Sequence, residues 1–478
     1  MFKKAIFAAA FLAAFITPAF AAGLNSGMSG KEAQIYLNGS RINARACIAE
    51  DGAVFLPVRS VFEALGYKVL FSGTDKRPAV TAQDGKNKLT LNINEQTIEK
   101  NGHSYCLNAP YGMAENGLLL YKGSAYLEAG LFSEALGFSK SFRGTDGYIS
   151  IRSAGANRIT VNNMKLCSEN EDIKVTVQYP QLDGLPSYDA QVGINSILRR
   201  AASSAIDEGL GFAYDLKTAK QSNPGFTAKC ETNFNYRITY NQNGILSVVL
   251  LDYQYSGGAH GGTLQSSYTF DLATGKVLEL SDLTVKNSAY TSYINSAIRK
   301  EIDKRVAAGD LYEFSDSRFE TVGDRPDFYL SGDSVVFYFQ EYEHFPYAAG
   351  IQEFPVLYSG LGGMLTSGYG FLTYPDNELL RDVKNTVPAG QTVNVELRRN
   401  PTTGFTWHYS LGNEGILEKS AESYTPDSAL TGSGGVCVWS FKALKAGQAK
   451  LIFKYYRDAD GEASATAGNT VLYNVTVR

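Results

Sequence analysis

The sequence is poor in histidine, cysteine and tryptophan, and it carries almost no excess of charge. Among 478 residues it has four His and five Cys with no C-x-x-C spacing, so we expect neither a metal site nor a cofactor. Basic residues number 44 against 48 acidic ones with no basic stripe, so we expect no nucleic-acid partner. Plentiful Gly, Tyr and Phe are instead typical of β-rich domains with many turns. The length favours about three domains.

Long apolar runs are also lacking, except at the start of the chain. Lys3 and Lys4 precede an apolar run over 5–20, and Ala19-Phe20-Ala21 supplies small residues for cleavage. A membrane span needs about 20 apolar residues. The run therefore predicts a signal peptide at 1–22 rather than an uncleaved anchor. After cleavage we expect no transmembrane segment and a protein that is secreted or held in the cell envelope.

The chain has five cysteines, an odd number, and disulfides can form in an exported protein. The cysteines are Cys47, Cys106, Cys167, Cys230 and Cys437. An odd count leaves at least one thiol unpaired within the monomer. Spacing suggests one pair in each of the first two domains, Cys47 with Cys106 and Cys167 with Cys230.

The first domain, expected at 33–154, contains an internal repeat. Residues 52–67 and 123–138 share Glu-Ala-Leu-Gly followed by an aromatic residue. Each copy predicts a short strand, a helix ended by Gly66 or Gly137, and another strand, because Gly accepts the left-handed conformation that closes a helix. Alternating apolar residues on either side predict further strands, and hence an α+β repeat domain.

This repeat resembles the copper amine oxidase N-terminal-like domain, a stalk module common on exported bacterial proteins. The resemblance implies a spacer or wall-binding module. His103 is the only histidine in the segment, so the name implies no copper site here.

The second domain, expected at 155–365, combines helices and strands. Apolar residues recur at helical spacing over 194–206 and 290–306. The runs 245–251 and 334–339 are strand-like. This pattern predicts an α+β domain with helices packed on an antiparallel sheet.

Three phrases in this domain, 255–262, 270–283 and 342–350, carry a second resemblance. They are similar to the domains of unknown function in lysozyme-sensing anti-sigma factors, which also precede the catalytic part of some peptidoglycan deacetylases. The resemblance implies a protein-binding module and no enzyme activity.

His260, flanked by glycines, is open to three interpretations: a catalytic base, a metal ligand, or part of a tight turn that the glycines permit. We favour the turn.

The third domain, expected at 384–478, reads as strands throughout. Residues 391–397, 436–441, 449–455 and 471–477 alternate or form short apolar runs, which predicts an all-β immunoglobulin-like sandwich. Cys437, Trp439 and Phe441 fall on one face. Cys437 is thus expected to be a buried free thiol, and Trp407 and Trp439 to help fill the core.

Three connections between these strands, 400–407, 431–435 and 456–461, can cluster at one end of such a sandwich and act as one binding edge. The Asn-Pro-Thr-Thr-Gly-Phe run at 400–405 with Trp407, and the Gly-rich stretch after 424–430, closely resemble the chagasin family of papain-like cysteine peptidase inhibitors. In the third connection Arg457 is kept, but Asp458 and Ala459 stand where the family has a proline and an aromatic residue.

The resemblance implies a set of peptidase-binding residues: Asn400, Pro401, Thr402, Thr403, Gly404, Phe405, Trp407, Gly432, Ser433, Gly434, Gly435 and Arg457. It also implies reversible occlusion of the cleft of a papain-like cysteine peptidase, with no catalytic residue in this chain. The alternative is a non-inhibitory envelope protein that binds or senses lysozyme or cell-wall components through its first two domains.

Overall fold

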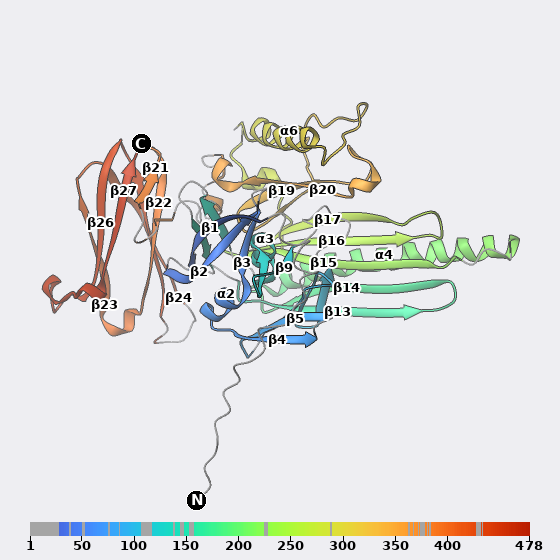
Figure 1. The fold of residues 1–478 in the computed structure, drawn as a ribbon, viewed down its shortest axis with the longest axis horizontal. Helices are drawn as coiled ribbons and strands as arrows, with labels where there is room; N and C mark the ends of the chain where they lie inside the picture. Colours follow the sequence, from blue (N-terminus) through green and yellow to red (C-terminus); the bar gives the residue numbers. More distant parts are fainter. Residues whose placement is uncertain are drawn as a thin grey trace, which may run out of the picture.

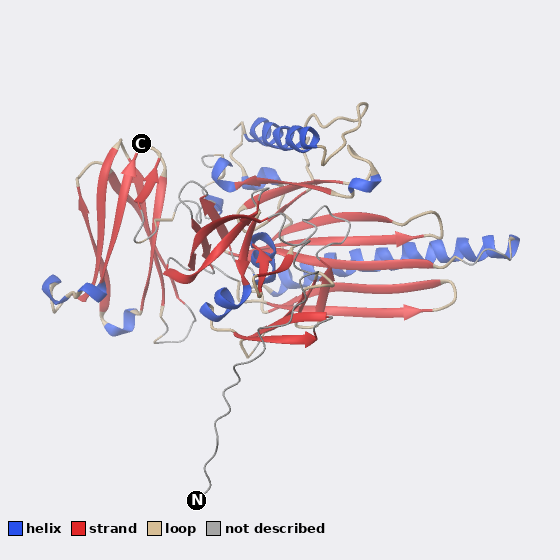
Figure 2. Ribbon diagram, viewed as in Figure 1, coloured by secondary structure: helices blue, strands red, loops and turns tan. Residues whose placement is uncertain are grey.

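The computed structural model describes residues 28–37, 40–49, 53–74, 77–85, 87–106, 117–136, 139–143, 148–152, 157–223, 228–286, 289–361, 364–366, 368–370, 372, 378–379, 381, 384–426, 432 and 434–478. The predicted signal peptide lies outside these ranges. Strands dominate the described part of the chain (Figure 2). None of the helices within these ranges combines the length and the apolar character needed to span a bilayer.

The N-terminal part is built from twelve described strands and two short helices. The strands are β1 Met28–Leu37, β2 Ser40–Ala49, β3 Val54–Pro57, β4 Lys68–Thr74, β5 Arg77–Gln83, β6 Lys88–Asn92, β7 Thr97–Lys100, β8 His103–Cys106, β9 Leu118–Tyr121, β10 Ser124–Glu128, β11 Ser139–Arg143 and β12 Tyr148–Arg152. They form a seven-stranded sheet in the order β11-β12-β1-β2-β3-β10-β9 and a five-stranded sheet running β4 to β8. One apolar core includes residues from both sheets.

The internal repeat is confirmed as two strand–helix–strand units. In the first, β3 leads into α2 (Val58–Ala64) and β4; in the second, β10 leads into α3 (Ala129–Leu136) and β11. Leu56 lies opposite Leu127, the same position of the other copy, and the rings of Phe62 and Phe132 are 5.0 Å apart. Gly66 takes φ +88°, as its place after α2 predicts; Gly137 lies outside the described residues. The two copies therefore pack against each other to make one core.

The middle part contains a second group of strands with the longest helix of the described chain. The elements are β13 Thr160–Glu169, β14 Ile173–Asp183, α4 Tyr188–Ser222, β15 Cys230–Gln242, β16 Ile245–Tyr255, β17 Gly262–Asp271, α5 Leu280–Leu283, α6 Tyr290–Ala308, β18 Phe328–Leu330, β19 Ser334–Phe339 and β20 Gln352–Leu357. They form a five-stranded sheet, β13 to β17, and a three-stranded sheet, β18 to β20.

The core contacts stack these elements as helix, sheet, sheet, helix. Figure 1 shows α6 lying over β19 and β20 at one side of this stack. On β16, Val248 and Leu250 join the core beneath α4, whereas Val249 and Leu251 meet Val336 of the smaller sheet. The other face of the smaller sheet packs on α6, which buries Ile294, Ile298 and Ile302. The run 245–251 is therefore apolar except for Ser247, because both of its faces are buried.

The expectation of a single antiparallel sheet in the middle part is wrong in two respects. The strands belong to two sheets, and the larger one is mixed, because β14 and β15 run parallel. A parallel pair needs a crossover connection, and α4 supplies it between β14 and β15. Helical and strand periodicity give no information on strand direction, so the sequence could not predict this.

The two suggested disulfides are wrong, since Cys47, Cys167 and Cys230 are free thiols. Cys167 is exposed on β13 and Cys230 is buried on β15, with β14 between them. Two strand spacings amount to about 10 Å, beyond the 7 Å or so that a disulfide can bridge between Cα atoms. Cys47 packs with Phe55 and Leu119; Cys106 lies in the other sheet.

The C-terminal part is a β-sandwich, as its alternation predicts. Its elements are β21 Lys384–Val387, β22 Thr392–Arg399, the 3₁₀ turn η4 Pro401–Thr403, β23 Phe405–Gly412, β24 Leu417–Pro426, β25 Gly435–Ala443, β26 Gly447–Arg457, η5 Glu462–Ser464 and β27 Thr470–Val477. One sheet has the order β21-β27-β26-β23 and the other β22-β25-β24. Cys437, Trp439 and Phe441 are all buried between them, as expected.

Candidate functional site

The three connections predicted to form a binding edge leave the sandwich at the same end. In one sheet, Arg399 at the end of β22 and Pro426 at the end of β24 both face Gly435, the first residue of β25. In the other sheet, Phe405 at the start of β23 faces Arg457 at the end of β26. Because strand ends in register lie side by side, the first loop (400–404), the third loop (458–469) and the strand ends that flank the second loop (427–434) share one edge (Figure 1).

The first loop is a single 3₁₀ turn that its own side chains close. The Oδ1 atom of Asn400 accepts hydrogen bonds from the Thr402 amide at 3.1 Å and the Thr402 hydroxyl at 2.7 Å. The Thr403 hydroxyl donates to the Asn400 carbonyl at 2.7 Å. Pro401 occupies the first position of the turn, and Gly404 ends it at φ +75°. Both threonines are exposed at the tip, with their hydroxyl protons committed within the loop.

Asn400 also ties the first loop to its neighbours. Its Nδ2 atom donates to the carbonyl oxygen of Gly432 in the second loop at 3.0 Å, and its amide donates to the hydroxyl of Tyr455 at 3.4 Å. Gly434 is half-buried and Gly435 is buried, so the end of the second loop packs down on the sheet. Ser433 lies outside the described residues.

A row of aromatic rings supports the first loop from below. Tyr455 lies between Phe405 and Trp407, at centroid distances of 5.4 and 4.8 Å. Trp407 is half-buried at the edge of the core and donates from Nε1 to the Arg398 carbonyl at 2.9 Å. Sequence reasoning missed Tyr455. The alternation of the strand could have found it, because Tyr455 lies two residues after Phe453 and four after Leu451, which both face inward along β26.

The third loop is held by charged contacts. The Arg457 guanidinium lies over the Phe405 ring, 4.7 Å from its centroid. The Asp458 carboxylate lies 3.0 Å from Nε2 of His408 on β23. Lys454 donates to Glu462 at 2.8 Å, and this hydrogen bond lowers the pKa of the Glu462 carboxyl. The contact between His408 and Asp458 was also missed, because nothing in the sequence joins residues fifty positions apart.

Cys437 is the free thiol that the sequence predicts. It is fully buried between the sheets, and burial raises its pKa to about 11. A thiol that stays protonated at neutral pH is a weak nucleophile, so Cys437 serves packing.

Two of the three characteristic phrases of the middle part meet in space. The rings of His260 and Tyr347 stack at 4.0 Å, and Tyr342 stacks on Tyr347 at 5.6 Å. The Tyr347 hydroxyl donates to the Gly261 carbonyl at 2.8 Å. Gly257 takes φ +94°, which agrees with the interpretation of this segment as a tight turn. Among the described residues, no group of three His, Cys, Asp or Glu side chains lies close enough to hold a metal ion.

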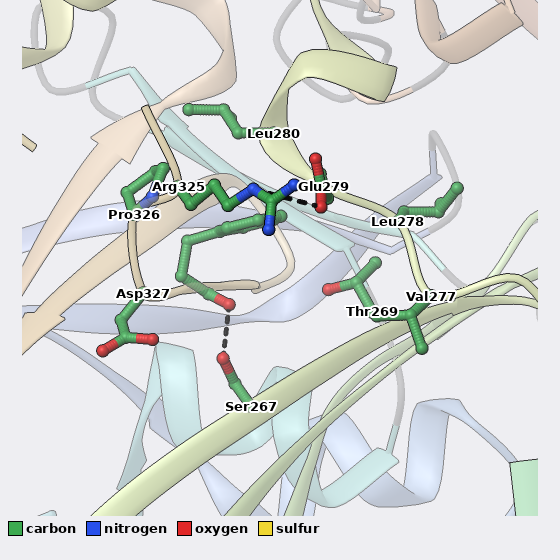
Figure 3. A pocket seen from close by; sticks show the side chains of 10 residues that line it. Ser267, Thr269, Val277, Leu278, Glu279, Leu280, Arg325, Pro326 and Asp327 are labelled. Atoms are coloured by element: carbon green, nitrogen blue, oxygen red, sulfur yellow. Dashed lines mark hydrogen bonds and ion pairs between the residues drawn. The ribbon is translucent and has the colours of Figure 1, made fainter. Parts of the chain in front are cut away.

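A pocket of about 130 Å³ lies where β17 approaches the chain leading into β18 (Figure 3). Ser267 donates to the Phe328 carbonyl at 2.6 Å, and Arg325 pairs with Glu279 at 3.7 Å. Burial raises the pKa of Asp327 on its wall. The Ser267 hydroxyl and the Arg325 guanidinium on the pocket wall thus already have partners within the protein.

A β-sandwich of two packed sheets whose connecting loops gather at one end is an immunoglobulin-like sandwich. Residues 386–477 match the model of the chagasin family of peptidase inhibitors, I42. They are 32% identical to chagasin of Trypanosoma cruzi over 91 residues, 18% of this chain and 83% of chagasin. Through this domain the chain belongs to the chagasin family. EhICP2, a cysteine protease inhibitor from Entamoeba histolytica, is similar at 19% identity and a TM-score of 0.18, over 20% of this chain and 86% of that one.

The remaining parts match other families. Residues 36–151 match the copper amine oxidase N-terminal domain, 166–263 the deacetylase PdaC model, and 281–359 a domain of unknown function, DUF3298. The peptidoglycan-N-acetylmuramic acid deacetylase PdaC of Bacillus subtilis is 25% identical over 154 residues, 31% of this chain and 31% of that protein. The chain thus spans about a third of the length of PdaC.

Proposed function

We propose that this chain is an exported protein whose C-terminal domain reversibly inhibits papain-like cysteine peptidases by inserting its three loops into the active-site cleft. The peptidase-binding residues are those of the first loop with Phe405 and Trp407, residues 432–434 of the second loop with the adjoining Gly435, and Arg457. The observation that carries the proposal is the tie between loops, in which Asn400 closes the first loop and holds the second through Gly432.

Preorganisation is what makes such an edge an effective inhibitor. Ordering a flexible loop costs free energy on binding, and loops already fixed by the sandwich avoid most of that cost. A protease–inhibitor contact typically buries about 1,600 Å² in total, an area within the reach of three loops. The tight turn at Thr402 and Thr403 presents no extended backbone for cleavage, so it occludes the cleft without being cut.

The experiment is a titration of papain with the full chain, using Gly404→Ala as the test variant. Gly404 takes φ +75°, a conformation that costs other residues about 1–2 kcal/mol. We therefore expect reversible inhibition by the native chain and a Ki raised about five- to thirtyfold by Gly404→Ala. Lys450→Ala, at the opposite end of the sandwich, is the control and should leave Ki within about twofold. Absence of inhibition at micromolar chain would overturn the proposal.

A second candidate function, which does not conflict with the first, is binding of lysozyme or a cell-wall component by the middle part. It is favoured by an aromatic surface in which exposed His260 and Tyr342 stack on half-buried Tyr347. Tyr342 is 56% exposed and held at φ +66°, a strained conformation for a bulky residue. Strain of this kind collects at binding sites.

Pull-down of the full chain with lysozyme and with insoluble peptidoglycan tests this second function. Tyr342→Ala should weaken whichever association occurs. Tyr188→Ala is the matched control, since Tyr188 is more exposed and its helix begins near Gly275, beyond the far end of β17. This role for the surface would be excluded if neither lysozyme nor peptidoglycan retained the chain. It would also be excluded if Tyr342→Ala and Tyr188→Ala weakened the association equally.

A further inference from the structure

Among the residues that the structure describes, β13 is the outermost strand on one side of the larger sheet of the middle part. Residues 164–169 are all exposed, although successive residues of a strand point to opposite faces of the sheet. This half of β13 is therefore accessible on both faces. An edge strand also presents backbone N–H and C=O groups with which a further strand can pair. β13 can thus accept one more strand at this edge.

The turn between β13 and β14 shows which backbone groups of β13 point to this edge. The Asn170 amide donates to the Ile173 carbonyl at 2.9 Å, so these two opposite residues form a hydrogen-bonded pair. Hydrogen-bonded and non-hydrogen-bonded pairs alternate along an antiparallel ladder. Counted back through the register of the two strands, residues 169, 167 and 165 therefore direct their backbone groups away from β14. Cys167 lies in the middle of this set.

The side chains of this set share one face of the sheet and include opposite charges in symmetric positions. Lys165 and Glu169 each lie two residues from Cys167. When two copies of β13 pair antiparallel, the register that places Lys165 opposite the second copy's Glu169 also places Cys167 opposite itself. A register centred on Lys165 or on Glu169 instead opposes like charges, which is destabilising. One register thus makes β13 complementary to a second copy of itself.

Apolar side chains on the other face of β13 continue the surface that α4 covers. Leu166 lies opposite Val177 of β14, which is buried in the core beneath α4. Met164 and Leu166 are nonetheless 43% and 46% exposed. In the register centred on Cys167, the two copies of Leu166 are diagonal neighbours, a spacing of about 7–8 Å that long side chains can bridge. Pairing therefore removes part of this apolar surface from water.

We propose that β13 is a dimerisation edge, at which the β13 strands of two copies of this chain pair antiparallel with Cys167 opposite Cys167. Such twofold pairing uses the same surface on both copies and therefore closes the assembly at a dimer. In a hydrogen-bonded pair the opposite Cα atoms are about 5.5 Å apart, within the roughly 4.4–6.8 Å that a disulfide spans. Cys167 is an exposed free thiol, so a disulfide can lock the dimer.

Locking the dimer needs an oxidant, which a small disulfide such as glutathione disulfide supplies. The Cys167 thiolate of one copy attacks the oxidant and releases one glutathione thiol, and the Cys167 thiolate of the second copy then displaces the other glutathione. Two protein thiols thus lose two protons and two electrons, and the oxidant is reduced to two thiols. The noncovalent pairing of the strands does not depend on this step.

Sedimentation velocity of the full chain under reducing conditions tests the pairing, and we expect a reversible dimer. Lys165→Glu places like charges opposite each other twice and should raise the Kd of the dimer about tenfold or more, as should Glu169→Lys. A mixture of these two variants restores opposite charges across the interface and should dimerise like the native chain. Lys68→Glu is the matched control, because Lys68 is exposed on β4, the outermost described strand of another sheet.

Treatment with glutathione disulfide, followed by electrophoresis without reductant, tests the register. The native chain should give a covalent dimer that Cys167→Ser abolishes and Lys165→Glu diminishes. A chain that stays monomeric and forms no Cys167 disulfide would overturn the proposal. So would a dimer that Lys68→Glu weakens as much as Lys165→Glu does, or charge variants that mixing does not rescue. These outcomes are independent of whether the chain inhibits a peptidase.

Discussion

Single side chains set the shape of the candidate binding edge. Asn400 performs three tasks: it accepts from Thr402, donates to Gly432 and donates through its backbone to Tyr455. The sequence predicts the first task, because Asn before Pro is typical of a capped turn. It does not predict the other two, since Gly432 lies in the second loop and Tyr455 on β26, both far from Asn400 along the chain.

Asn400→Ala removes both the turn closure and the tie to the second loop. Loss of a cap costs about 1 kcal/mol, so we expect Ki for papain to rise about fivefold or more. Asn400→Asp keeps the acceptor for Thr402 but loses the donor to Gly432, and its effect should be smaller. Asn413→Ala is the control, because Asn413 donates to the Gln448 carbonyl at the other end of the sandwich. Equal increases in Ki for Asn400→Ala and Asn413→Ala would contradict this account.

At the scale of elements, the contact between α4 and the larger sheet of the middle part depends on one glycine. A Cβ on Gly209 would lie 1.9 Å from Oγ1 of Thr232, a fully buried residue of β15 whose hydroxyl donates to Gln254 at 2.7 Å. Gly211, two residues along the helix, has open space around it. The helical pattern over 194–206 predicts only part of α4 (Tyr188–Ser222) and ends before either glycine, so it does not distinguish them.

The two glycines make a matched pair of substitutions to alanine. Gly209→Ala forces α4 away from β15 or breaks the hydrogen bond to Gln254, and should lower the free energy of unfolding by about 1–3 kcal/mol. Gly211→Ala should raise it by about 0.5–1 kcal/mol, since alanine favours the helix. Urea unfolding followed by circular dichroism measures both changes. Similar effects from the two substitutions would show that α4 does not pack as described.

At the scale of the whole molecule, the parts are joined by specific polar contacts. Arg158 donates to the carbonyl of Pro426, at the base of the second loop, at 2.7 Å. His103, on β8 of the N-terminal part, is buried against the middle part, with its ring 3.8 Å from that of Tyr236 and a nitrogen 3.0 Å from Oδ1 of Asn235. Burial lowers the pKa of His103 to about 4. The one histidine of the segment that resembles the copper amine oxidase domain thus joins two parts of the chain.

This burial predicts an acid-sensitive junction. In the unfolded chain His103 binds a proton below about pH 6.5, whereas in the folded protein it stays neutral until about pH 4. The unfolded state therefore binds more protons between these values, and stability falls as pH drops through the window, by up to about 3 kcal/mol. Above about pH 6.5 this contribution of His103 to the free energy of unfolding is fully present.

Urea unfolding at about pH 7 and pH 4.5, followed by circular dichroism, should show a smaller pH effect in His103→Gln than in the native chain. Tryptophan fluorescence is the internal control, because both tryptophans lie in the sandwich. That signal should respond to pH alike in the two proteins. An equal pH effect on the circular dichroism of both would rule out the neutral, buried state of His103.

The sequence by itself determined what depends on neighbours along the chain. Alternation at 436–441 predicts the buried row of Cys437, Trp439 and Phe441, and the repeated Glu-Ala-Leu-Gly predicts α2, α3 and the turn at Gly66, because side-chain periodicity and glycine conformation are local properties. Only the tertiary structure decided which distant groups meet: Asn400 with Gly432, His408 with Asp458, and Cys167 apart from Cys230. Those contacts depend on strand order and direction, and no local pattern encodes either.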